Sequence, residues 1–146
     1  MVFANTTHPD RYHGFAKKPP YFEGWYYKLV SADEESRLAV IPGMYLAPDE
    51  KNNHCFVQVF DSDEQEVRYH RYPFSAFQAS RDSFEVKIGP NTFTQDGITL
   101  AIDDEIGRLH GKLEFADLNP WPVSFFSPGA MGWFAWVPMM ECYHGV

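Results

Sequence analysis

Apolar and polar residues alternate with a period of two in three stretches, and this constrains the fold more than any other feature. Val86 and Ile88 alternate with Glu85 and Lys87. The same pattern holds for two further apolar sets, Ile98, Leu100 and Ile102, and Leu109, Leu113 and Phe115. Successive side chains of a strand point to opposite faces, so this pattern predicts antiparallel strands packed on one face. No stretch of three helical turns shows amphipathic periodicity.

Turn residues divide the rest of the chain into further short strands, which we expect at residues 24–31, 38–45 and 54–61. Within the second of these, Pro42 and Gly43 predict a bulge or kink. We expect hairpin loops at residues 91–96 and 103–107. This spacing predicts an all-β antiparallel barrel or sandwich. A closed eight-stranded barrel could hold one small apolar ligand.

Composition narrows the range of partners. The chain has 146 residues, the size of one domain, and a net charge of −8, which argues against nucleic acid as a partner. Aromatic residues make up 17% of it, enough to pave an apolar cavity or cover an interface. We therefore expect a hydrophobic small molecule or a protein as partner. Cys55 and Cys142, with no apparent secretory signal, predict free thiols and a cytoplasmic protein.

Residues 118–140 carry no charge, yet four prolines argue against a membrane-spanning helix. Residues 117–140 instead predict a long aromatic C-terminal loop, with peripheral membrane contact as one option. We expect an irregular arm at residues 1–20 and a single β domain at residues 21–146. Because so many rings need burial, we also expect a homodimer, or a missing C-terminal half that covers them.

Two stretches resemble the tocopherol cyclase family: "YFEGWYYKLV" at residues 21–30 and "SPGAMGWFAWVPMMECYHGV" at residues 127–146. The resemblance implies a lipocalin-like β-barrel and places this chain as the N-terminal half of a longer two-barrel architecture. It also implies closure of a chromanol ring on a prenylated hydroquinone by protonation of an alkene. That reaction needs an acid in an apolar pocket and no metal or redox cofactor.

Three residues are candidates for catalysis: Glu23, Glu141 and His144. A carboxyl group among aromatic rings, as at Glu23, can keep its proton at neutral pH and act as an acid. Its alternative role is to accept backbone N–H groups at a turn. Glu141 and His144 could form an acid with an orienting partner, or make only structural hydrogen bonds. As metal ligands they would lack a third group nearby.

Six residues are candidates for substrate contact: Trp25, Tyr27, Met131, Trp133, Trp136 and Tyr143. Each could equally pack in a core or at an interface. Three functional classes therefore stay open at this point. They are a tocopherol cyclase-like enzyme, a non-catalytic lipocalin-like binder of a lipid or isoprenoid, and a dimerising interaction module.

Overall fold

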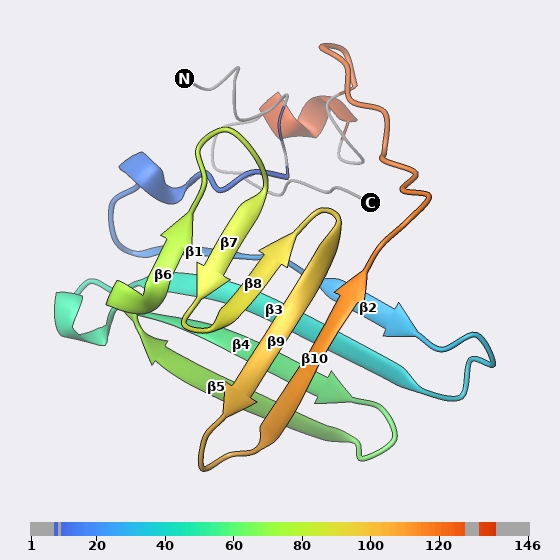
Figure 1. Cartoon of the computed structure of the whole chain (residues 1–146). Coiled ribbons are helices and arrows are strands. Elements are labelled where there is room, and N and C mark those ends of the chain that lie inside the picture. The colour runs from blue at the N-terminus through green and yellow to red at the C-terminus, as the bar shows by residue number, and fades with distance from the viewer. Residues whose placement is uncertain (1–7, 9, 128–131, 137–146) are drawn as a thin grey trace.

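The computed structural model of the protein describes residue 8 and residues 10–127 and 132–136, which form two antiparallel β-sheets (Figure 1). These residues contain no α-helix, and their four helical segments are short 3₁₀ turns at Gly14–Ala16, Glu50–Asn52, Phe74–Ala76 and Gly132–Trp136. The strands are β1 (Tyr21–Gly24), β2 (Tyr27–Val30), β3 (Arg37–Leu46), β4 (His54–Asp61), β5 (Glu66–Pro73), β6 (Phe77–Ala79), β7 (Glu85–Ile88), β8 (Asn91–Thr94), β9 (Gly97–Asp103) and β10 (Arg108–Glu114). The expected all-β antiparallel class is confirmed.

Each sheet has five strands within the described part of the chain. In sheet 1, β1 and β2 both pair with one edge of β3, and β4 and β5 follow on its other side. Sheet 2 has the order β10-β9-β8-β7-β6. No described strand of one sheet pairs with a strand of the other. The described strands therefore form an open two-layer arrangement, and the closed barrel that was one of the expected forms is not seen.

The core lies between the two sheets. Its largest fully buried side chains include Phe93, Met44, Ile88, Ile102 and Val57. In sheet 2, Val86, Ile98 and Leu100 are also buried, whereas Lys87 and Thr99 are exposed. The predicted alternation in β7 and β9 is thus confirmed. In β10 the apolar residues are less covered, and Leu113 is 43% exposed, because this strand lies at the edge of its sheet.

One expected loop is a strand. Residues 91–94 form β8, which pairs with β7 and β9. The side chain of Asn91 is buried and accepts a hydrogen bond from the Ala101 N–H at 2.9 Å while donating to the Ile88 carbonyl oxygen at 2.9 Å. Phe93 is fully buried in the core. Asparagine is common in turns, so its presence at residue 91 suggested a loop. Here its side chain is buried because it hydrogen-bonds to Ile88 and Ala101 inside the sheet.

The expected bulge at Pro42 and Gly43 is also wrong. Both residues keep an unbroken antiparallel register with β4, opposite Val57 and Phe56. On the other side of β3, Gly24 pairs with Gly43 and Tyr27 pairs with Val40, so β1 and β2 share one register. Trp25 donates its N–H to the Pro42 carbonyl oxygen at 2.9 Å, but Pro42 has no N–H to return. The proline therefore interrupts the ladder without shifting it.

The segment after β10 follows the expectation of a long aromatic loop as far as it is described. Residues 117–127 contain no helix or strand, and Gly132–Trp136 forms a 3₁₀ helix (Figure 1). Several of its large apolar side chains are exposed, among them Phe126 at 87% and Trp133 at 62%. None of the helices that the described residues form has the length and apolar character needed to cross a bilayer.

A hydrogen-bonded pair of His70 and Asp104 links the two sheets. His70 on β5 is 1% exposed, and its Nδ1 lies 2.8 Å from Oδ2 of Asp104, in the turn between β9 and β10. Asp104 also accepts the backbone N–H groups of Ile106 and Gly107. Partial burial tends to raise the pKa of the Asp104 carboxyl, but the hydrogen bonds from His70, Gly107 and Ile106 outweigh it and lower this pKa.

We predict that Gly43→Ala destabilises the fold. A Cβ at this position would lie 2.4 Å from Cζ of Phe56 and 3.1 Å from the Glu23 carbonyl oxygen, so the ring and the neighbouring strand would have to move. The free energy of unfolding should fall by about 1–3 kcal/mol in urea denaturation. Gly111→Ala is the matched control, because a Cβ there meets nothing within 4 Å. Equal stability of the two variants would contradict this packing.

We predict that the stabilising effect of Asp104 depends on pH. Its folded-state pKa lies below the ordinary 3.8, so the carboxylate contributes stability above that value and loses it as the pH falls through the folded pKa. The difference in unfolding free energy between the wild type and Asp104→Asn should be largest above about pH 5 and shrink at lower pH. Urea titrations at a series of pH values measure it. A difference that stays constant with pH would exclude the ionised Asp104 carboxylate as its source.

Candidate functional site

Glu23 is the candidate catalytic residue that the structure describes. Burial alternates along β1. Tyr21 and Glu23 are partly buried, whereas Phe22 and Gly24 are exposed. Because β1 and β2 share one register, Trp25 continues the half-buried series on the same side. The Glu23 carboxylate therefore lies at the margin of the core, and its side chain is 13% exposed.

The N-terminal arm covers this carboxylate. Tyr12, His13 and Gly14 are buried, although the arm was expected only to be irregular. The backbone N–H of His13 donates to both carboxylate oxygens of Glu23, at 3.0 and 3.1 Å. A Cβ at Gly14 would lie 2.3 Å from the Tyr12 hydroxyl oxygen, so any other residue here would displace the buried Tyr12 ring. Glu23 thus ties the arm to β1.

Two side chains add to the polar cluster around Glu23. Tyr21 donates its hydroxyl to Oε2 of Glu23 at 2.7 Å, and Nδ1 of His13 lies 3.4 Å from Oε1. On its other side, Nε2 of His13 lies 3.0 Å from the carbonyl oxygen of His8. Both ring nitrogens of His13 therefore face oxygen atoms, one on Glu23 and one on His8.

Aromatic rings form the wall beside this cluster. The Tyr12 ring packs edge-on against Phe15 and Phe77, at 4.7 and 5.1 Å between centroids, and lies 6.2 Å from the Trp25 ring. Burial, and next the negative charge of Glu23, raise the pKa of Tyr12 to about 12. Tyr12 therefore remains a neutral phenol beside the carboxylate.

Two of the predicted substrate-contacting residues, Trp25 and Tyr27, lie in the core on the same side as Glu23. The Trp25 indole donates to the carbonyl oxygen of Asp10 at 3.2 Å, which adds a second tie to the arm. Its ring lies 5.6 Å from the Phe84 ring, which also stacks on Tyr27 at 6.5 Å. The Tyr27 hydroxyl donates to the Thr94 carbonyl oxygen at 2.9 Å, and burial raises the pKa of Tyr27.

The other predicted site residues are not brought to this cluster by any described contact. Trp133 stacks on Phe134 at 4.2 Å, and the Trp136 indole donates to the Phe125 carbonyl oxygen at 3.1 Å. Four of them lie outside the described residues, namely Met131, Glu141, Tyr143 and His144. The described part of the chain contains no group of three or more His, Cys, Asp or Glu side chains placed to hold a metal ion.

Sequence reasoning missed Tyr12, His13 and Tyr21 as members of the site. The one signal available was the tripeptide Tyr-His-Gly, which occurs at residues 12–14 and again at residues 143–145. It carries no information on which strand the arm would cover. The pair of His70 and Asp104 was missed for a similar reason, since 34 residues separate its members.

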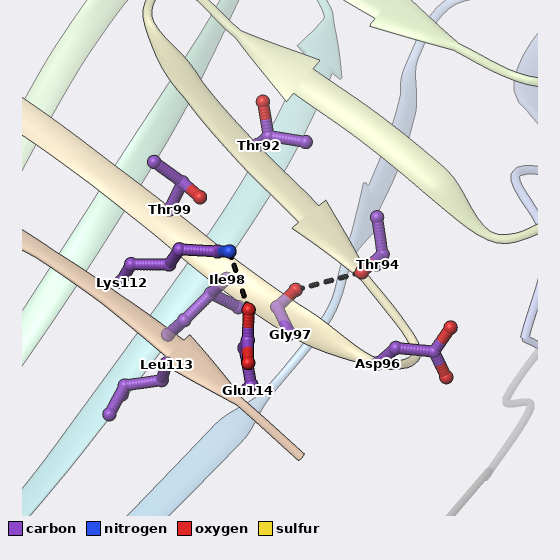
Figure 2. A pocket seen from close by; sticks show the side chains of 9 residues that line it. All are labelled: Thr92, Thr94, Asp96, Gly97, Ile98, Thr99, Lys112, Leu113 and Glu114. Carbon is purple, nitrogen blue, oxygen red and sulfur yellow. Dashed lines mark hydrogen bonds and ion pairs between the residues drawn. The ribbon is translucent and has the colours of Figure 1, made fainter.

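A separate hollow of about 240 Å³ lies beside β8, β9 and β10 (Figure 2). The residues that line it are Thr92, Thr94, Asp96, Gly97, Ile98, Thr99, Lys112, Leu113 and Glu114. Lys112 and Glu114 form an ion pair along β10 at its edge, and the Thr94 hydroxyl donates to the Gly97 carbonyl oxygen at 3.0 Å (Figure 2). Threonine and charged side chains share its lining with the apolar Ile98 and Leu113.

We predict that Glu23→Gln loosens the arm. A hydrogen bond to a charged group contributes about 1.5–3 kcal/mol, so loss of the carboxylate should raise the open population of the arm roughly tenfold or more. Trypsin should then cut after Arg11 correspondingly faster, as followed by mass spectrometry at a temperature where the fold is intact. Asp104→Asn, which removes the carboxylate that faces His70 far from the arm, should leave this cleavage rate unchanged. Equal rates in wild type and Glu23→Gln would contradict the tether.

Comparisons with models of protein families, with curated proteins and with solved structures found no match to this chain. A functional assignment therefore depends on the geometry around Glu23 and on the two sequence motifs.

Proposed function

We propose that the protein is tocopherol cyclase-like: it binds a prenylated hydroquinone in a lipocalin-like β-structure and closes the chromanol ring. The observation that carries the proposal is the largely buried Glu23 carboxylate, which lies 3.4 Å from the His13 imidazole and beside the Tyr12 ring. Glu23 and Trp25 also belong to the motif "YFEGWYYKLV", one of the two that resemble the family.

The reaction moves protons and makes one carbon–oxygen bond. An acid adds a proton to the less substituted carbon of the alkene, which leaves a tertiary carbocation on the other carbon. The phenol oxygen attacks that carbocation, and the phenol proton then passes to the conjugate base of the acid. Substrate and product are isomers, the acid is regenerated, and no oxidant or reductant takes part.

The described residues suit two parts of this chemistry. In this proposal the Glu23 carboxyl delivers the proton, and the His13 imidazole, 3.4 Å away and held by the His8 carbonyl oxygen, is its partner. The faces of the Tyr12 and Trp25 rings supply electron density that stabilises a nearby carbocation. Glu141 and His144 remain the second predicted acid and its partner.

A second candidate is a non-catalytic binder of a lipid or isoprenoid. One observation favours it: the Glu23 carboxylate already accepts the His13 N–H and the Tyr21 hydroxyl, the arrangement expected of a structural anchor. The ligand would be the same class of molecule. The two candidates therefore differ in turnover and agree on binding.

The test is incubation with a prenylated hydroquinone in D₂O without oxygen, followed by chromatography and mass spectrometry. Because the chromanol is an isomer of its substrate, mass alone does not distinguish them. Enzymatic cyclisation in D₂O should place one non-exchangeable deuterium on carbon, so the product should be one mass unit heavier after washing with water. Binding is followed in parallel by quenching of tryptophan fluorescence.

Glu23→Gln and His13→Gln should lower the cyclisation rate roughly 100-fold or more and retain ligand binding, because they remove the proton-holding pair but leave the aromatic wall. Asp104→Asn is the matched control and should cyclise at the wild-type rate. Saturable binding without a deuterated chromanol would exclude the cyclase and support the binder. Absence of both binding and turnover would overturn both candidates.

A further inference from the structure

Strand β10 leaves one of its two edges unpaired among the described residues. It pairs with β9 along its whole length in one unbroken antiparallel register, and no described strand pairs with its other edge (Figure 1). The strand has seven residues and contains no proline. Proteins usually shorten, bulge or cover such edges, because an open edge pairs readily with another strand. The free edge of β10 can therefore accept a further strand into sheet 2.

The backbone groups that face the free edge belong to every second residue of β10. The Phe115 N–H donates to the Asp96 carbonyl oxygen at 2.8 Å, and the Asp104 N–H donates to the Gly107 carbonyl oxygen at 3.2 Å. Hydrogen-bonded positions alternate along an antiparallel pair, so the odd-numbered residues of β10 bond to β9. The residues whose N–H and carbonyl groups point away from β9 are the even-numbered ones, Arg108, His110, Lys112 and Glu114.

These directions limit how β10 can pair with a second β10. Even-numbered residues must meet even-numbered residues, so the two-fold axis passes through a residue of the strand. With the axis at Gly111, the sequence Arg-Leu-His-Gly-Lys-Leu-Glu pairs with itself over all seven residues. An axis at His110 would place Arg108 opposite Lys112, and an axis at Lys112 would place two lysines opposite each other. The register centred on Gly111 is therefore favoured.

The register centred on Gly111 matches opposite charges on one face of the sheet and apolar side chains on the other. It places Arg108 of each copy opposite Glu114 of the other copy, and opposite charges in such cross-strand pairs attract. On the core side it places Leu109 opposite Leu113, which is 43% exposed in the single chain. At the axis Gly111 meets Gly111, so no side chains clash where the strands approach most closely.

We propose that β10 pairs with β10 of a second copy of this chain and joins the two copies of sheet 2 into one continuous sheet. A second copy is the occupant because it presents the complementary charges and the glycine at the required positions. The remaining pair joins His110 to Lys112, and a neutral imidazole there does not repel the ammonium group. This interface is independent of the chemistry proposed for Glu23.

Sedimentation velocity at protein concentrations from about 1 to 100 µM measures the assembly. The wild type should approach twice the monomer mass of 16.9 kDa. Arg108→Glu and Glu114→Arg should each raise the dissociation constant of the dimer roughly tenfold or more, because two attractive pairs become repulsive. The Arg108 and Glu114 side chains are 75% and 76% exposed, so the fold of the monomer should be kept, as circular dichroism will verify.

Combining the two substitutions should restore the dimer. The double variant Arg108→Glu/Glu114→Arg exchanges the charges and should dimerise like the wild type. An equimolar mixture of the two single variants should form a heterodimer, because both glutamates of one copy then meet both arginines of the other. The matched control is Lys87→Glu on β7, which changes the net charge as Arg108→Glu does and should remain dimeric.

Amide hydrogen exchange locates the interface within β10. The N–H groups of His110 and Lys112 should exchange more slowly at 100 µM than at 1 µM protein, whereas those of Leu109 and Gly111, which bond to β9, should change less. A wild type that is monomeric throughout would overturn the proposal. A dimer that both single variants leave intact would also overturn it, as would a double variant that stays monomeric while folded.

Discussion

Burial of one face of each sheet against the other is the constraint on which the rest of the structure depends. Side chains such as Met44, Val57, Phe93 and Ile102 meet between the sheets and are almost completely excluded from water. Because side chains alternate along a strand, a shift by one residue would move the whole apolar set to the solvent side. The core therefore specifies the register of every strand that contributes to it.

That register also places the polar groups of the site. Once Met44 faces the core, its partner Glu23 on β1 must lie on the same side of sheet 1. A carboxylate there needs hydrogen-bond partners, and the arm supplies His13 while β1 supplies Tyr21. At another position, His70 meets Asp104 between the sheets. Among the described residues, every fully buried side-chain nitrogen and oxygen has a hydrogen-bond partner.

The aromatic residues divide into two populations with different physical roles. Tyr12, Trp25, Tyr27 and Phe93 pack inside, with Phe93 in the centre of the core and Tyr12 beside Glu23. Residues 118–127 and 132–136 hold the other population on the surface, without a charged residue among its rings. The first population stabilises the fold by burial, whereas the second leaves large apolar area in contact with water.

The pattern of residues along the sequence was enough to predict the all-β class, the core-facing residues of β7 and β9, and the absence of helix or strand in residues 117–127. These features depend on neighbours along the chain, since side-chain alternation and the breaking effect of proline act over a few residues. The sequence also drew attention to Glu23, because a carboxyl group among five aromatic residues is uncommon. The sequence could not identify β8, because Asn91 is a residue type common in turns. Its hydrogen bonds to Ile88 and Ala101, which allow it to lie in a strand, are visible only in the structure.

Tertiary structure alone decided which groups meet at the site. His13 and Glu23 are 10 residues apart, and His70 and Asp104 are 34 apart, and neither separation follows a local period. The two members of each pair meet only when the strands are in their native register and, for His13, when the arm lies over β1. The same holds for the open edges of both described sheets, because closure into a barrel depends on the relative placement of the sheets. Contacts of this kind depend on the packing of the whole core, which no short stretch of sequence contains.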